Sequence, residues 1–85
     1  MPAKKFLVEK EVEKRIKKLP AQIKKRIPEV LLSIKDNPVL GIRLHGELYG
    51  LYKFRIGDYR IIYRFDSKQS VVTVVKIEHR QGVYK

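Results

Sequence analysis

The segment that most constrains the fold is Leu51 to Phe65, which reads LYKFRIGDYRIIYRF. Within it, Gly57-Asp58 separates two runs rich in aromatic and β-branched residues, a pattern typical of a β-hairpin with a two-residue turn. A turn of that length sets the register of the two strands. The predicted pairs are Ile56 with Tyr59, Arg55 with Arg60, Phe54 with Ile61, Lys53 with Ile62, Tyr52 with Tyr63 and Leu51 with Arg64.

Side-chain alternation gives the two faces of this hairpin different chemistry. One face, expected to pack on the core, carries Tyr52, Phe54, Ile56, Tyr59, Ile61 and Tyr63. The other face carries Lys53, Arg55, Arg60 and Arg64. Because Arg55 lies opposite Arg60, like charges oppose each other across the strands, which destabilises a hairpin. We therefore predict that this basic face binds a polyanion.

The composition agrees with a basic globular domain. The chain has 85 residues, enough for one modest core, so we expect a single domain spanning 1–85. Lys and Arg number 20 against 9 Asp and Glu, and this net charge of +11 favours nucleic acid, an anionic membrane or an acidic protein as partner. We find no apolar run of membrane-spanning length, no signal peptide and no cysteine. A cytoplasmic protein that does not enter a membrane is the expectation.

A strand and two helices are predicted before the hairpin. The segment from Lys4 to Val8 suits a short edge strand. A stripe of apolar residues spaced three and four apart then predicts a helix from about Glu9, and it consists of Val8, Val12, Ile16 and Leu19. Pro20 ends this helix and can begin the next one.

The second helix is predicted from Pro20 to Lys35 and contains a proline. Its apolar stripe is Ile23, Ile27, Val30, Leu31 and Ile34. Pro28 lacks an amide proton and clashes with the carbonyl of Lys24, which costs about 3 kcal/mol in a regular helix. We therefore predict a kink near residues 24–27, or two shorter helices.

The last strand is predicted from Val71 to Glu78, after a connector of loop or bulged strand at residues 39–50. Its sequence, VVTVVKIE, is almost continuously apolar and favours a central strand buried on both faces. We expect Val71, Thr73, Val75 and Ile77 to face the helices, and Lys76, Glu78 and Arg80 to face the other way. The predicted class is α+β, a helical hairpin packed on a small, mainly antiparallel twisted sheet in the order β-α-α-β-β-β.

The residues with reactive side chains favour phosphodiester chemistry over other kinds. His45 and His79 are far apart and no cysteine is present, so we expect no metal site and no cofactor. What remains is a cluster of Lys53, Arg55, Arg60 and Arg80, with His79 and Tyr84 near it. Guanidinium groups bind phosphate bidentately and stabilise developing negative charge, and a tyrosine can stack on a base. Lys53 or His79 could move the protons.

Three segments carry a resemblance to a known family. They are Leu44-His45-Gly46, then YKFRIGDYRIIYRF from Tyr52 to Phe65, and then HRQGVY from His79 to Tyr84. Together with the order of elements, they resemble the RelE/ParE superfamily of toxins from toxin-antitoxin systems across essentially the whole chain. The terminal HRQGVY favours the RelE branch.

The resemblance implies a ribosome-dependent endoribonuclease. Such a toxin cuts mRNA in the ribosomal A site, without metal, by attack of a 2′-hydroxyl on the adjacent phosphate, and a cognate antitoxin neutralises it. The catalytic set implied by position is Lys53, Arg55, Arg60, Arg80, Tyr84 and His79. Arg60 matches the arginine that holds the scissile phosphate, Tyr84 matches the tyrosine that stacks on the base, and either Arg80 or His79 is the general acid. The residues expected to contact RNA are Lys53, Arg55, Arg60, Arg64, Lys76 and Arg80.

Other interpretations of the same residues stay open. A ParE-like chain would inhibit DNA gyrase without cutting RNA, and a non-catalytic module would only bind RNA or the ribosome. A basic domain that binds an acidic protein is a further alternative. Arg60 could also be a surface residue paired with Asp58 or Glu78, and Lys53 a solvated lysine.

Overall fold

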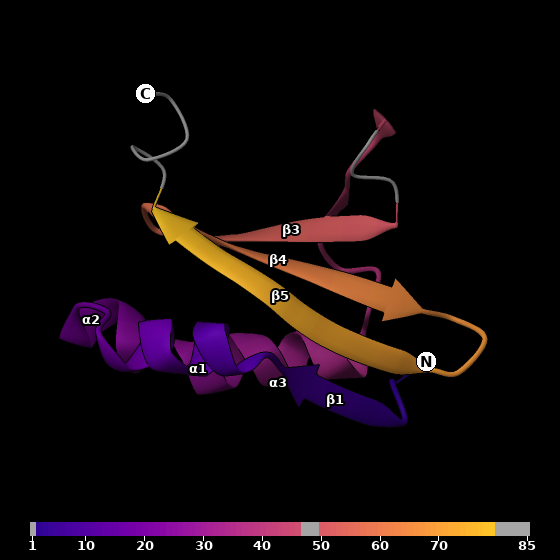
Figure 1. Ribbon diagram of the computed structural model, residues 1–85, viewed down its shortest axis with the longest axis horizontal. Coiled ribbons are helices and arrows are strands. Elements are labelled where there is room, and N and C mark those ends of the chain that lie inside the picture. Colours follow the sequence, from indigo (N-terminus) through magenta and orange to yellow (C-terminus); the bar gives the residue numbers. More distant parts are fainter. Residues whose placement is uncertain (1, 47–49, 80–85) are drawn as a thin grey trace.

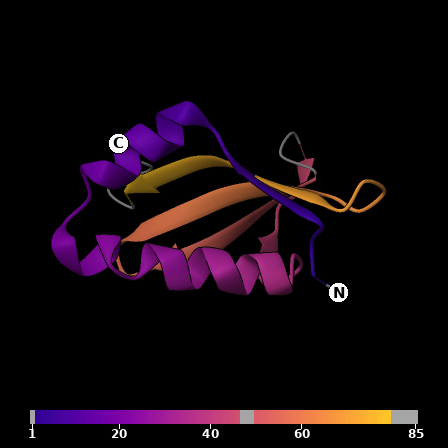
Figure 2. The ribbon, with the colours of Figure 1, turned by 90° about the horizontal axis from the view of Figure 1, so that it is seen from below.

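The protein folds as a mixed five-stranded sheet with its helices on one face. This computed structural model describes residues 2–46 and 50–79. In chain order the elements are β1 (Lys5–Val8), α1 (Lys10–Lys17), α2 (Ala21–Lys24), α3 (Ile27–Asp36), β2 (Ile42–Arg43), β3 (Leu51–Ile56), β4 (Tyr59–Asp66) and β5 (Val71–His79). Figure 1 shows the helices below the sheet, and Figure 2, which is seen from below, shows α1 beside β5 and α3 alongside β4 and β3. The predicted α+β class is confirmed, with β2 as an additional short strand.

The sheet is built around the predicted hairpin. Its strand order is β1-β5-β4-β3-β2, and among these described strands only β1 and β5 pair in parallel. The β3–β4 register is the predicted one at all six pairs, from Ile56 with Tyr59 to Leu51 with Arg64. Gly57 has φ +57°, the left-handed conformation that the tight turn requires. The register prediction is therefore confirmed.

The helices begin and end where the prolines predict. α1 carries Glu11 and Glu13 in its first turn and basic residues in its last, which suits the helix dipole. Pro28 divides the second predicted helix into α2 and α3, and it lies in the first turn of α3, where no amide hydrogen bond is lost. The predicted break is thus confirmed. None of the described helices is long and apolar enough to cross a membrane.

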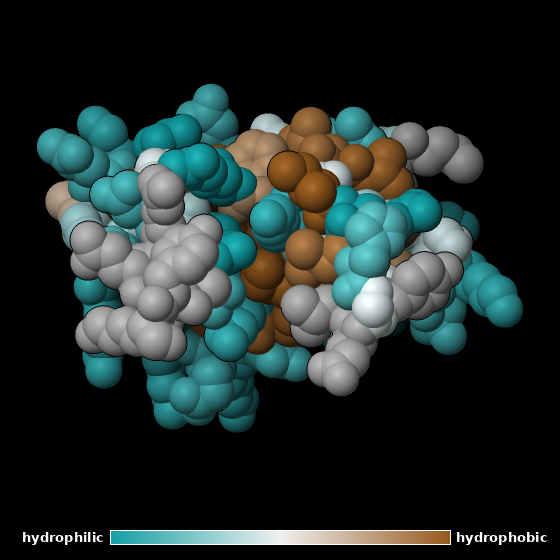
Figure 3. Space-filling view, turned by 90° about the horizontal axis from the view of Figure 1, so that it is seen from above, coloured by the Kyte–Doolittle hydropathy of each residue, from teal (hydrophilic) through white to brown (hydrophobic). Residues whose placement is uncertain are grey.

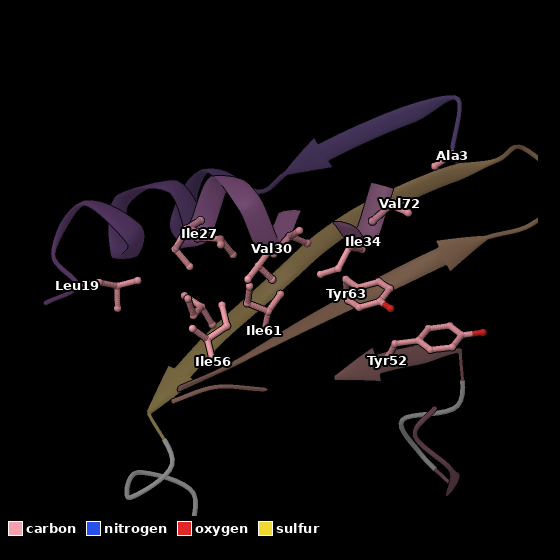
Figure 4. Close-up of a cluster of buried hydrophobic side chains, with 13 residues drawn as sticks. Ala3, Leu19, Ile27, Val30, Ile34, Tyr52, Ile56, Ile61, Tyr63 and Val72 are labelled. Atoms are coloured by element: carbon pink, nitrogen blue, oxygen red, sulfur yellow. The ribbon is translucent and has the colours of Figure 1, made fainter. Parts of the chain in front are cut away.

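The core lies between the helices and the sheet. Figure 4 shows the apolar side chains of both layers meeting there, among them Ile27, Val30, Ile34, Ile56 and Ile61. Tyr52 and Tyr63 also belong to it, and their rings stack with centroids 5.3 Å apart. The face assigned to the core by alternation therefore does pack on the helices, which removes these two tyrosines from the candidate site.

The prediction for β5 needs a correction. Val72, Val74 and Ile77 are the buried residues of this strand, whereas Val71, Thr73 and Val75 are only partly buried. The register against β4 shifts between Ile62 and Tyr63, which face Lys76 and Val74 respectively, so Val75 is an extra residue in β5. The expected inward set was right at Ile77 and wrong before it, and the strand is not buried on both faces. This bulge restores the expected orientation for Lys76 and Glu78.

Candidate functional site

The face of the sheet opposite the helices carries the predicted cations. Lys53 and Arg55 come from β3, Arg60 and Arg64 from β4, and Lys76 from β5. Figure 3 looks onto this open face and shows hydrophilic side chains around an apolar area. Ile62 is one apolar residue with this orientation, and it is only 8% exposed because it lies between Lys53 and Lys76 on the neighbouring strands. The aliphatic stems of the two lysines can cover it while their charges reach solvent.

The two opposed arginines of the hairpin turn away from each other. Arg55 donates from Nε to the Gly57 carbonyl oxygen over 3.3 Å, towards the turn. Arg60 instead points its Nε to the Glu78 carboxylate at 3.5 Å, towards β5. This divergence relieves the repulsion expected from their register, because each guanidinium has its own acceptor.

Glu78 is the carboxylate that balances part of this charge. One of its oxygens meets Arg60, and the other lies 3.3 Å from the Lys76 ammonium group. The Arg60 and Glu78 side chains are 21% and 23% exposed, so their attraction is less screened by water than that of a surface pair. The sequence named this pairing as an alternative to a phosphate contact. A guanidinium held in place by one carboxylate still has other donors for an anion.

A pocket of about 210 Å³ lies beside the turn of the hairpin and contains three of the predicted residues. Lys53, Arg55 and Arg60 line it together with Ile42, Gly57, Asp58 and Tyr59. The structure thus brings together cations that are up to seven positions apart in the sequence. With three positive side chains and one carboxylate around it, this pocket suits an anion such as a phosphodiester.

His79 lies in a different place. It lines a larger groove of about 540 Å³ between α1 and the end of β5, which it shares with Lys76 and Glu78. Its ring meets Tyr59 edge-on, with centroids 4.8 Å apart. His79 therefore does not line the pocket of Lys53, Arg55 and Arg60. Its role as general acid stays a prediction.

Two further predicted residues, Arg80 and Tyr84, lie outside the described residues. Arg64 is exposed on β4 opposite Leu51, away from the pocket. Among the described residues, no group of three or more His, Cys, Asp or Glu side chains is arranged to hold a metal ion. The described part of the site is therefore the set around Lys53, Arg55 and Arg60.

The buried Tyr63 holds the segment that leads into β2, the strand from which Ile42 lines the pocket. The Tyr63 hydroxyl donates to the Pro38 carbonyl oxygen over 2.8 Å and accepts from the Gly41 amide over 2.9 Å. Burial raises the pKa of Tyr63 above its ordinary 10.0, an effect that the Gly41 hydrogen bond partly opposes and Tyr52 reinforces. The phenol therefore stays neutral and can both donate one hydrogen bond and accept the other. Sequence reasoning placed Tyr63 in the core but missed this contact, because nothing local marks a partner 22 residues away.

Comparisons with known proteins agree with this architecture. The family model described as "ParE toxin of type II toxin-antitoxin system, parDE" matches residues 6–84. The chain is 31% identical to the toxin RelG of Mycobacterium tuberculosis over 70 residues, and this aligned segment covers 80% of each protein. It is 32% identical over 72 residues to the toxin RelE of the same organism, covering 82% of this chain and 74% of that one. Over most of its length the chain is thus similar to small toxins of toxin-antitoxin systems.

Solved structures give the same result. A chain of the RelBE2 toxin-antitoxin complex from M. tuberculosis superposes with a TM-score of 0.82 at 27% identity, covering 94% of this chain and all of that one. A chain of the archaeal RelE-RelB complex from Pyrococcus horikoshii superposes with a TM-score of 0.79 at 31% identity, covering 94% and 97%. This chain belongs to the RelE/ParE family of toxins of type II toxin-antitoxin systems.

Proposed function

We propose that this toxin is an endoribonuclease that cuts mRNA in the ribosomal A site, without a metal ion, and that a cognate antitoxin neutralises it. The observation that carries the proposal is the pocket in which Lys53, Arg55 and Arg60 meet on the open face of the sheet. Such a pocket provides what a phosphodiester needs, namely fixed cations on rigid strands. The proposed action on the ribosome also implies that the protein works in the cytoplasm.

The reaction would be an internal transesterification. The ribose 2′-oxygen forms a bond to the adjacent phosphorus and loses its proton, and the bond from phosphorus to the 5′-oxygen breaks as that oxygen takes up a proton. The products are a 2′,3′-cyclic phosphate and a 5′-hydroxyl. Arg55 and Arg60 stay charged and so act by stabilising the negative charge of the transition state. Lys53, His79 or Arg80 would handle the protons.

The antitoxin is proposed from the relatives and from charge. One similar solved structure is described as a toxin-antitoxin complex, and another as a RelE-RelB complex. A chain with a net charge of +11 and a basic open face is complementary to an acidic segment. We expect such a partner to cover the cations and so block access of RNA.

Primer extension on mRNA translated in the presence of the purified protein tests the proposal. We expect discrete cuts in phase with codons, and Arg60→Ala should slow cleavage roughly 10²- to 10³-fold, as removal of one donor to a developing oxyanion does in other enzymes. Lys68→Ala, on the turn between β4 and β5, removes one charge away from the pocket and serves as the matched control.

Other outcomes would favour the alternatives. No cuts together with inhibition of DNA gyrase would replace the proposal with a ParE-like activity. Salt-sensitive RNA binding without any cuts would leave a non-catalytic binding module. Equal cleavage by the wild type and Arg60→Ala would remove Arg60 from the site.

A further inference from the structure

The pocket of the proposed nuclease has an apolar side as well as a charged one. Ile42 lines it together with the cations and is 66% exposed, the largest exposed fraction among the large apolar side chains of the described residues. It is the Cα partner of Lys53 on β3, so the two side chains lie next to each other on the same face of the sheet. An exposed isoleucine beside an anion pocket needs its own explanation.

The fold holds Ile42 in place through buried contacts. The segment before it is bound to the core by the Tyr63 hydroxyl, which accepts from the Gly41 amide and donates to the Pro38 carbonyl oxygen. On the other side of β2, the Leu44 amide donates to the Leu51 carbonyl oxygen over 2.9 Å. These hydrogen bonds fix both ends of the two-residue strand, so the exposure of Ile42 is part of an ordered surface.

Gly41 shows how closely this strand approaches the sheet. A Cβ at this position would lie 2.6 Å from the Lys53 carbonyl oxygen and 2.9 Å from the Tyr63 hydroxyl. Every residue other than glycine would therefore push β2 away from β3. The glycine allows Ile42 to reach the edge of the pocket.

We propose that Ile42 is the wall against which a base of the bound RNA packs while the cations hold the adjacent phosphate. This inference rests on the proposed nuclease function and adds a nucleobase subsite to it. A nucleotide has a charged part and a flat apolar part, and the pocket has a matching side for each. Isoleucine side chains make such contacts with bases in other nucleic-acid complexes. A free phosphate or a polyphosphate would leave Ile42 unused.

Binding of two matched oligonucleotides tests the subsite. Both are short single strands with 2′-O-methyl riboses, which prevents cleavage, and one of them lacks its bases. We expect the wild type to prefer the base-bearing strand, and Ile42→Ser to reduce that preference roughly five-fold while leaving affinity for the abasic strand unchanged. Ile42→Leu should retain the preference. Leu32→Ser, at an apolar residue of α3 that is 59% exposed, is the matched control and should also retain it.

A second variant reaches the same subsite indirectly. Gly41→Ala leaves Ile42 in the sequence but displaces β2, so we expect the same loss of preference with abasic binding retained. An unchanged preference in Ile42→Ser, or equal binding of both strands by the wild type, would overturn the inference and leave the nuclease proposal standing. Unchanged RNA preference with weaker antitoxin binding would assign this wall to a protein partner and overturn it too. Failure to bind either strand would also overturn the subsite, whereas the proposed function is decided separately by primer extension on translated mRNA.

Discussion

The two faces of β3 and β4 differ in almost every respect although they come from alternate residues of the same strands. The helix-covered face contributes Tyr52, Ile56, Ile61 and Tyr63 to the core, each at most 7% exposed. The open face holds cations, two of which meet different acceptors: Arg55 donates to the Gly57 carbonyl oxygen, and Arg60 pairs with Glu78. Apolar burial stabilises the first face, whereas the second face carries more cations than the Glu78 carboxylate can balance.

This difference teaches that stability and chemistry can be changed independently in this sheet. A side chain on the covered face is surrounded by packed atoms, so its removal leaves a cavity. A side chain on the open face borders solvent and a few charged groups, so its removal costs little folding energy. Substitutions at neighbouring residues of one strand should therefore differ: one should lower mainly stability, and the other mainly activity.

The largest effect on stability is expected from Ile61→Ala, compared with Arg60→Ala at the adjacent position. Ile61 is 1% exposed, so its truncation should lower the free energy of unfolding by about 2–5 kcal/mol. Arg60→Ala should lower it by about 1 kcal/mol or less, because it loses one partly exposed ion pair. Urea titration of both variants measures the difference.

Activity should follow the reverse order. Cleavage per folded molecule should stay near the wild-type rate in Ile61→Ala and fall strongly in Arg60→Ala. If Ile61→Ala is too unstable to purify, Ile61→Val gives the same comparison at about 0.5–1.5 kcal/mol. Equal losses of stability from both positions would contradict the separation of the two faces.

An intermediate effect on stability is expected from Tyr63→Phe, because the Tyr63 hydroxyl joins the covered face to the segment before β2. The change leaves the Gly41 amide and the Pro38 carbonyl oxygen without their phenol partner, at a cost of about 1–3 kcal/mol. Because burial raises the pKa of Tyr63 in the folded state, its contribution is fully present below about pH 10 and is lost as the pH rises through the folded-state value.

Urea titrations at about pH 8 and about pH 11 check this dependence. The wild type should lose more stability than Tyr63→Phe between the two values, since every other side chain is the same in both proteins. Parallel losses would show that the phenol does not contribute through its proton.

A smaller effect on stability than that of Tyr63→Phe is expected from Gly57→Ala at the turn. The residue has φ +57°, where a side chain costs about 1–2 kcal/mol, and its methyl group would lie 3.2 Å from Cδ1 of Ile23, which can move. A loss of this size with full activity per folded molecule indicates that the register holds. Loss of activity along with stability would indicate a slipped hairpin, because a shift by one residue exchanges the two faces.

Much of the fold and part of the site could be predicted from the sequence. The Gly57-Asp58 turn and the alternation around it determined the β3–β4 register, and Pro28 determined the break between α2 and α3. These predictions succeed because the responsible interactions are local. The run VVTVVKIE gave no sign of its bulge, because a row of valines looks the same in either register.

By itself, the sequence determined the hairpin, its two faces and the presence of Lys53, Arg55 and Arg60 on one of them. Only the tertiary structure decided which carboxylate meets Arg60, that His79 lies in the groove beside α1, and that Ile42 forms one side of the pocket. The physical reason is the distance along the chain over which each interaction acts. Turn and strand geometry act over a few residues, whereas the Tyr63 hydroxyl that holds β2 in place joins segments more than 20 residues apart.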